Sequence, residues 1–234
     1  MQLFFQENIT PPLVTLDADE SKHLTRVLRK KQGDLISLTN GQGKLFECVI
    51  LEANPSKTTL KVMKTIEVPE EEFYIHLAIA PTKSPDRMEW MVEKITEIGF
   101  HELTLLETMN SERSFLKTDR LEKKIISACK QSLKYRIPKL NSISRIDSIL
   151  ESKHFDDYQK FIAYVDDHHD NHLFDSAEAK GKYLVLIGPE GDFDPAEIKK
   201  ALSKGFKPAS LGKSRLRTET AGLAAVEMLQ LINR

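Results

Sequence analysis

The chain has few cysteines, few aromatic residues and no long apolar stretch. Only two of its 234 residues are Cys and one is Trp. Cys48 and Cys129 stand far apart and fit no metal-ligand spacing, so we expect buried free thiols in a reducing compartment. No apolar run is long enough to cross a membrane, and the N-terminal MQLFFQENITPP lacks the basic start and apolar stretch of a signal peptide. These absences favour a cytoplasmic protein over a secreted or membrane protein.

Net charge is nearly absent as well, but the charges are unevenly distributed. The formal net charge is −1, with 34 Lys and Arg against 35 Asp and Glu. Between Lys117 and Arg145, nine basic residues face only two acidic ones. Such a segment can bind phosphates, although a solvated helix face accounts for charge alone slightly better.

Residues 1–68 carry the alternating pattern of a mostly β region. Segments 34–41, 44–53 and 58–68 predict strands, and the first two form a hairpin around a Gly-Gln-Gly turn. One helix precedes them, beginning at Asp17 or Asp19 and ending at Gly33. We predict a small β-barrel-like domain whose helix has a basic face, followed by a Pro-containing linker at 69–72. The basic face consists of Lys22, Arg26, Arg29 and Lys30.

Residues 73–234 alternate strands with helices, which predicts a mostly parallel sheet covered on both faces. The expected strands are FYIHLAIA, ELTLLE, FIAYV, YLVLIG and ASLG. The expected helices begin at Ser84-Pro85, Thr118, Asp194 and Glu219. In such a fold, ligands bind in the crevice beyond the carboxyl ends of the strands.

Two glycine-bearing segments near the C-terminus mark that crevice. They are LVLIGPEGDFDPAE (184–197) and LGKSRLRTETAGLAA (211–225), and each joins an expected strand to an expected helix. Neither is a known phosphate loop. A P-loop needs Gly where Lys207 stands, and Gly188 and Gly191 do not complete a dinucleotide fingerprint. We therefore expect one site built from both loops, for a ligand other than a nucleoside triphosphate or NAD.

The segment DDHHDNH (166–172) has residue types that can bind a divalent metal. Adjacent loop positions rarely give tetrahedral geometry without distant partners. A polar loop is therefore the favoured interpretation, and we predict no metal site.

Six segments, in this order, resemble the SPOUT-class RNA methyltransferases, and among them the bacterial enzymes that methylate N3 of a uridine in 16S ribosomal RNA. They are HLTRVLRKKQGD, KSPDRMEWMVEKITEIG, ERSF, ACKQS, IGPEGDF and LGKSRLRTETA, and they cover essentially the whole chain. The resemblance implies a PUA-like RNA-binding domain at 1–68 and an α/β methyltransferase domain with a trefoil knot at 73–234. It also implies S-adenosylmethionine as cofactor, and a homodimer with the cofactor pocket near the subunit interface.

The resemblance also assigns residues to the cofactor site. One wall would consist of Ile187, Gly188, Pro189, Glu190 and Gly191, and the other of Leu211, Gly212, Leu216 and Arg217. Apolar side chains and backbone amides are what an adenine face requires.

Methylation of uracil N3 removes a proton and develops negative charge on the flanking carbonyl oxygens, which a fixed cation stabilises. Arg113 and Arg217 are the candidate cations. RNA phosphate positioning, or a salt bridge such as Arg217 with Glu219, is an equal alternative. Glu190 is a candidate proton acceptor or cofactor-amine partner, but it can equally fix a helix start, and water is another possible base.

A paired base cannot reach such a pocket, so RNA contacts must offset the cost of exposing it. We predict that Arg26, Arg29, Lys134 and Arg136 bind RNA. Two positions depart from the family: Asp192 replaces a glycine, and Lys134 replaces an arginine. These departures leave two alternatives, a non-catalytic RNA-binding protein of the same fold, or an enzyme of the same fold that acts on another RNA.

Overall fold

The computed structural model describes residues 2–111, 118–165 and 171–234. Contacts divide the chain into two compact units. Unit 1 comprises Met1–Glu70 and Ile126–Ile137, and unit 2 comprises Glu71–Ile125 and Pro138–Arg234. The helix α3 (Asp119–Gln131) therefore contributes its first half to unit 2 and its second half to unit 1. The second segment of unit 1 has no counterpart in the sequence-based division at residues 69–72, because tertiary contacts alone define it.

Unit 1 is a five-stranded sheet in the order β1-β3-β4-β5-β2. β1 runs parallel to β3, and the other pairs are antiparallel. The alternating pattern buries one set of side chains, among them Phe4, Leu38 and Leu60, which have no exposed surface. The strand bounds are β1 Leu3–Phe5, β2 Leu13–Thr15, β3 Leu35–Thr39, β4 Lys44–Glu52 and β5 Thr59–Glu67.

The N-terminal helical region of unit 1 is shorter than the sequence predicts. Helix α1 (Ala18–Lys22) is capped by Asp17, whose Oδ1 accepts from the Glu20 N–H at 2.8 Å. A π-helical turn η1 (His23–Val27) follows. The predicted extension to Gly33 is wrong, because Arg29 has a φ of 54° and this left-handed conformation stops the helix. Arg29 and Lys30 therefore lie beyond the helix.

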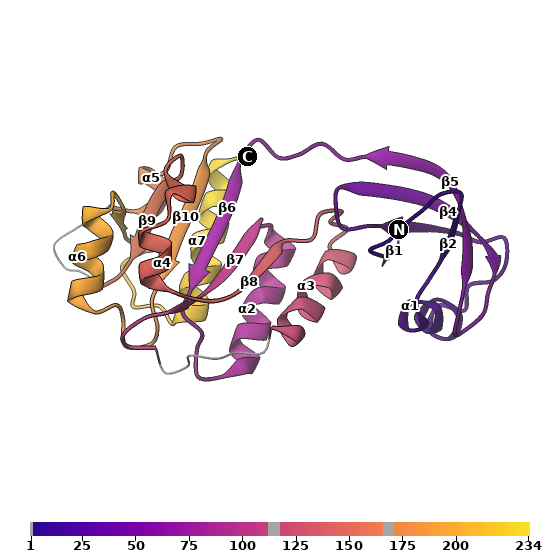
Figure 1. The fold of residues 1–234 in the computed structure, drawn as a ribbon, viewed down its shortest axis with the longest axis horizontal. Coiled ribbons are helices and arrows are strands. Elements are labelled where there is room, and N and C mark those ends of the chain that lie inside the picture. The colour runs from indigo at the N-terminus through magenta and orange to yellow at the C-terminus, as the bar shows by residue number, and fades with distance from the viewer. Residues whose placement is uncertain (1, 112–117, 166–170) are drawn as a thin grey trace. The chain divides into compact units, whose positions relative to one another are not determined.

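Unit 2 contains a six-stranded sheet in the order β11-β9-β10-β6-β7-β8, in which every neighbouring pair is parallel. This confirms the α/β class, and Figure 1 shows β6 to β10 with helices on both sides. β8 was not among the expected strands. The bounds are β6 Tyr74–Ile79, β7 Glu102–Glu107, β8 Lys139–Arg145, β9 Gln159–Ala163, β10 Lys182–Ile187 and β11 Lys207–Ala209.

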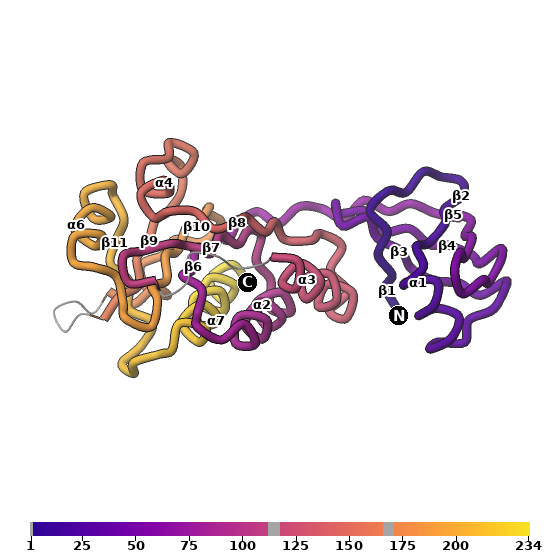
Figure 2. Tube along the Cα trace, turned by 60° about the horizontal axis from the view of Figure 1, so that its bottom comes forward, coloured from indigo at the N-terminus to yellow at the C-terminus, as the bar shows by residue number. Residues whose placement is uncertain are grey.

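Helices cover both faces of this sheet. α2 (Pro85–Ile98) and α7 (Thr218–Ile232) pack against each other and lie side by side in Figure 2. Gly222 of α7 allows this close packing, since a Cβ there would lie 2.9 Å from both Ile79 Cδ1 and Met91 Sδ. On the other face, α4 (Ile146–Leu150) and α6 (Pro195–Ser203) cover an apolar cluster that includes Leu184, Leu186 and Phe193. The remaining short helices are η2 (Lys153–Phe155) and α5 (Leu173–Ser176).

The register brings five strand ends to one edge of the sheet. Ile187 at the end of β10 pairs with Ile79 of β6 and with Ala163 of β9. Ala163 in turn pairs with Ala209 of β11, and Ile79 pairs with Leu105 of β7. The loops that follow these strands therefore all begin at this edge, which we call the carboxyl edge.

Across the described ranges, no helix is both long and apolar enough to cross a membrane.

Candidate active site

The first glycine loop leaves β10 at the centre of the carboxyl edge. Ile187 is 2% exposed, Gly188 and Pro189 are buried, and Glu190 and Gly191 are exposed. A Cβ on Gly188 would lie 3.1 Å from the Phe193 ring. Glycine at 188 therefore accommodates Phe193 closely. The first part of the loop is thus buried and apolar, and the exposed carboxylate of Glu190 follows it.

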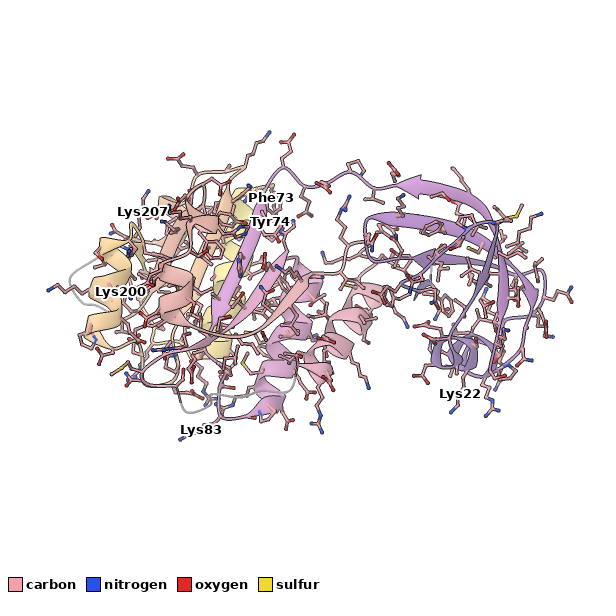
Figure 3. All side chains as sticks on the ribbon, in the orientation of Figure 1. Lys22, Phe73, Tyr74, Lys83, Lys200 and Lys207 are labelled. Atoms are coloured by element: carbon pink, nitrogen blue, oxygen red, sulfur yellow. The ribbon has the colours of Figure 1, made fainter. Side chains whose placement is uncertain are left out.

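Glu190 joins this loop to the loop after β6. Its Oε1 accepts from the Lys83 N–H at 3.2 Å. Figure 3 labels Lys83 beyond the end of β6, just ahead of α2. The candidate roles of Glu190 are proton acceptor, cofactor-amine partner and residue that fixes a helix start. The Lys83 contact supports the last of these, because Lys83 lies just ahead of α2. The carboxylate is also exposed and therefore accessible to a substrate.

The acid that caps the helix after the first loop is Asp194. It is not Asp192, the acid that departs from the family. Asp194 caps α6, and its side chain accepts from the Ala196 N–H at 2.8 Å. Glu197 completes the capping box through the Asp194 N–H at 3.0 Å, and its Oε1 also accepts from the Met109 N–H at 2.9 Å. The capping box predicted at 194–197 is confirmed. Asp192 is therefore not the cap of α6.

The second glycine loop connects β11 to α7 at the same edge. Gly212 has a φ of 123° with nothing within 4 Å of an added Cβ, so its backbone conformation, and not crowding, requires glycine. Leu211 and Leu216 are half-buried, and Arg217 is exposed at the N-cap position of α7. Apolar side chains and a cation thus line this loop, as the sequence predicts for the second wall.

Glu219, in the first turn of α7, is a carboxylate whose surroundings the sequence did not reveal. It is 5% exposed, and its Oε1 lies 3.8 Å from Arg87 Nε of α2. Its ion-pair partner is therefore Arg87, and not Arg217 as considered above. Its Oε2 is buried without a hydrogen-bond partner in the described part of the chain. The sequence did contain a signal for the burial of Glu219. Glu219 lies three residues before Gly222, and this spacing places both residues on the helix face that packs on β6.

A residue shortly after β9 contacts the first glycine loop, and this contact was not predicted from the sequence. Val165 follows β9, and its N–H donates to Asp192 Oδ2 at 3.1 Å. The end of strand FIAYV was a usable signal, since parallel neighbours deliver their loops to the same edge. Two predictions fall outside the described residues, namely Arg113 and the part 166–170 of the DDHHDNH segment. Within the described residues, no group of His, Cys, Asp or Glu could hold a metal ion.

The four cations predicted to bind RNA all belong to unit 1. Arg26 and Arg29 are exposed on η1 and just after it. Arg136 has structural partners: its guanidinium donates to Gln42 O at 3.1 Å and Val68 O at 3.0 Å. It also covers Gly43, where any Cβ would collide with it. Lys134 is half-buried.

An open groove of about 1300 Å³ also lies on unit 1. It is lined by residues of β1, η1, β3, β4, β5 and α3 and by Lys30 after η1, and three of the lining residues are basic or can become so: His23, Lys30 and Lys130. Lys130 is already paired with Glu20, a carboxyl whose pKa burial raises despite this pairing. The groove mixes exposed apolar surface, such as Met63, with these cations.

A polar network occupies the opposite edge of the unit 2 sheet. Burial alone would raise the pKa of Glu102, but hydrogen bonds from Asn141, Lys139 and Tyr74 and the nearby His76 lower it to about 2. Burial lowers the pKa of His76 to about 4, against the attraction of Glu102. Figure 3 labels Tyr74 at the start of β6 and Lys83 beyond its end. The network therefore stands apart from the carboxyl edge and takes no part in the site.

Both thiols are free and buried, which confirms the prediction. Burial raises the pKa of Cys48 to about 11 and of Cys129 to about 12. A nucleophilic cysteine needs the thiolate, so neither residue serves as one near neutral pH.

The fold and the paired loops match one group of known proteins. Residues 69–230 match the RNA methyltransferase domain family, and residues 16–63 match the RNA methyltransferase PUA domain family. The first match covers well over half of the chain. The chain therefore belongs to the RNA methyltransferase family, with a PUA domain preceding the catalytic one.

Individual relatives agree with this assignment. The chain is 30% identical over 225 residues to ribosomal RNA small subunit methyltransferase E of Buchnera aphidicola, covering 91% of this chain and 86% of that protein. A probable rRNA-methyltransferase from Porphyromonas gingivalis has a similar structure, with a TM-score of 0.94, 40% identity and coverage of 100% and 98%. Ribosomal RNA small subunit methyltransferase E from Neisseria gonorrhoeae, bound to S-adenosyl methionine, gives a TM-score of 0.87 at 27% identity, with coverage of 100% and 98%.

Proposed function

We propose that this protein transfers a methyl group from S-adenosylmethionine to N3 of a uridine in 16S ribosomal RNA. The observation that carries the proposal is that both glycine loops begin at the carboxyl edge of the sheet, in a chain of the RNA methyltransferase family. The relatives named for small-subunit ribosomal RNA methylation, one of them bound to the cofactor, support the choice of substrate and methyl donor.

The residues present suit the cofactor. Leu211 and Leu216, which are half-buried, provide apolar surface for an adenine ring, and Ile187 is buried at the start of the first loop. The backbone of the first loop from Gly188 to Gly191, together with that of Gly212, provides amide groups next to this surface. S-adenosylmethionine, when bound, supplies a methyl group on a positively charged sulfur.

In the proposed reaction the protein aligns uracil N3 with the methyl carbon and manages one proton. Glu190, exposed at the carboxyl edge, accepts the N3 proton, and the nitrogen lone pair then forms the new bond to carbon. S-adenosylmethionine, when bound, would supply the methyl carbon, and its sulfur would keep the electron pair of the carbon–sulfur bond and become neutral. Arg217 stabilises the negative charge on the uracil carbonyl oxygens, with Arg113 as a second cation for this role. Replacement of Glu190 by Gln tests the proton step, because it removes the proposed proton acceptor and should lower kcat at saturating cofactor and RNA.

Unit 1 supplies the RNA contacts in this scheme. Arg26 and Arg29 are exposed and project from the same short segment, which suits phosphate binding. Lys134 and Arg136 would extend the contact, although Arg136 must share its guanidinium with Gln42 and Val68. We infer that the enzyme acts in the cytoplasm as a homodimer. Sedimentation of the purified protein at twice 26.7 kDa would support the homodimer.

The proposal is tested in two stages. Calorimetry with S-adenosylmethionine comes first, and absence of binding would point to a non-catalytic RNA-binding protein. Transfer of labelled methyl groups is then compared between small ribosomal subunits, naked 16S RNA and transfer RNA, all from cells lacking the modification. Label confined to transfer RNA would exclude the ribosomal substrate, and mass spectrometry of the labelled nucleoside checks the position of the methyl group on uracil.

A further inference from the structure

One residue joins three loops of the carboxyl edge. The Asp192 carboxylate accepts from the Val165 N–H after β9 at 3.1 Å, and from the N–H of its neighbour Phe193 at 2.8 Å. Its backbone carbonyl accepts from Asn110 Nδ2, in the loop after β7, at 3.1 Å. Its own N–H donates to Pro189 O within the first glycine loop at 3.0 Å. The loops after β7, β9 and β10 are thus connected through Asp192.

Asn171 and Leu173, just before and at the start of α5, are hydrogen-bonded to Ser210, which precedes the second glycine loop. The Ser210 N–H donates to Asn171 O at 2.7 Å, and the Leu173 N–H donates to Ser210 O at 2.9 Å. Ser210 directly precedes Leu211 of the second wall. Val165 is therefore bound to the first glycine loop, and Asn171 and Leu173 are bound to the start of the second.

The backbone conformation explains why the residue at 192 can be either glycine or aspartate. Asp192 has a φ of 63°, in the left-handed region that glycine occupies without cost and that Asp tolerates better than most residues. Glycine would fit this turn equally well, but it has no acceptor for the Val165 N–H. Only a residue such as Asp or Asn keeps the turn and also reaches the neighbouring loop.

We propose that Asp192 is a positioning residue that ties Val165, just after β9, to the first glycine loop and so preorganises the cofactor pocket on that side. This rests on the proposed function, since it assigns the pocket to S-adenosylmethionine. Binding to a preorganised site avoids the cost of ordering the loop at the moment of binding. Because the effect is geometric, it applies equally to S-adenosylmethionine and to its neutral-sulfur product, S-adenosylhomocysteine.

The first experiment follows the tie itself in the ligand-free protein. Hydrogen–deuterium exchange at the Val165 amide should be about tenfold faster in Asp192→Gly than in the unmodified chain, since a hydrogen bond to a charged group is lost. Asp192→Asn keeps one acceptor oxygen and should give an intermediate rate. Equal exchange in the unmodified chain and in Asp192→Gly would show that no tie exists and would overturn the proposal.

The second experiment measures what the tie does for binding. Calorimetry should show the Kd of Asp192→Gly rising about three- to tenfold for both S-adenosylmethionine and S-adenosylhomocysteine, with kcat at saturating cofactor changed by less than about twofold. Weakening for the sulfonium cofactor alone would mean that Asp192 acts through its charge, which overturns a positioning role. Faster Val165 exchange with an unchanged Kd for both ligands would also overturn it.

A matched control separates the backbone effect from the tie. Lys180 has a φ of 59°, is exposed and lies in the turn ahead of β10, at the opposite end of that strand from the first glycine loop. Lys180→Gly relieves the same kind of conformation and should change neither Val165 exchange nor either Kd. If the unmodified protein binds neither ligand, the proposed function fails, while the exchange experiment still decides whether Asp192 holds the loop.

Discussion

At the scale of single residues, Arg217 is the side chain on which the proposed chemistry depends most. It is exposed at the start of α7, and the neighbouring carboxylate Glu219 pairs with Arg87 instead. Arg217→Ala should lower kcat by about 10² to 10³, a loss typical of removing one donor from a charge-stabilising site. The change is measured by single-turnover methyl transfer at saturating cofactor and RNA.

Two variants show whether the loss belongs to the transition state. Arg217→Lys keeps the charge without the planar fork and should recover part of the rate. Arg215→Ala, which removes an exposed cation two residues earlier in the same loop, is the matched control and should leave kcat near its original value. An equal loss in the Arg215 and Arg217 variants would instead indicate general RNA attraction.

At the scale of elements, the turn η1 and the residues after it carry the predicted RNA contact. Replacement of both Arg26 and Arg29 by Gln should weaken RNA binding and reduce the slope of log K against log salt by about 1.5 to 2, because two phosphate contacts are lost. Binding is measured by filter retention at several salt concentrations. Lys207→Gln, an exposed cation on β11 that Figure 3 labels, is the control and should leave the slope unchanged.

An unchanged slope in the double variant would place the phosphate contacts elsewhere on the protein. Arg136 requires a separate interpretation, since its removal also frees the carbonyls of Gln42 and Val68 and uncovers Gly43. A loss of RNA affinity in an Arg136 variant would therefore need a measurement of unfolding beside it.

At the scale of the whole molecule, the network around Glu102 and His76 sets the acid stability of unit 2. His76 has a folded pKa of about 4, below its ordinary 6.5, so the unfolded chain takes up a proton first and stability falls as the pH drops from 6.5 to 4. Glu102 has a folded pKa of about 2, below 4.5, so its contribution is lost as the pH drops from 4.5 to 2. Each loss is on the order of 2–3 kcal/mol.

Urea unfolding between pH 7 and 3 measures this dependence. Glu102→Gln should lower stability at pH 7 and flatten its fall below pH 4.5, whereas His76→Gln should flatten it between pH 6.5 and 4. Cofactor affinity at pH 7 should not change in folded His76→Gln, because the network lies at the amino ends of the strands. A steep fall that persists in both variants would assign the acid sensitivity to other groups.

Local patterns were sufficient to predict most elements of unit 2. The periodic apolar positions and the Ser84-Pro85 and Gly99 boundaries predicted α2, which the structure places at Pro85–Ile98. The strand β8 was missed because its residues are half-buried or exposed and none is buried, which leaves no clear alternation. The helix after Asp17 was predicted too long because the left-handed turn at Arg29 contains no glycine or proline that would indicate it in the sequence.

For the site, the sequence identified the two glycine loops, and the structure brings both to the carboxyl edge. It did not identify Val165, the burial of Glu219 beside Arg87, or the contacts of Asp192. The cofactor and catalytic roles given to Arg113, Glu190 and the loop residues stay predictions, as does the trefoil knot that the family resemblance implies.

The sequence by itself determined the α/β class, the order of the segments that resemble the methyltransferase family, and the residue types of both loops. These depend on periodicity and on neighbours along the chain, which local sequence specifies. Only the tertiary structure decided that residues 126–137 belong with the N-terminal unit, that Glu219 is buried beside Arg87, and that Asp192 holds the loop of Val165. The physical reason is that parallel pairing joins strands far apart in sequence, so contacts at their ends follow from the order of strands in the sheet and not from any local pattern.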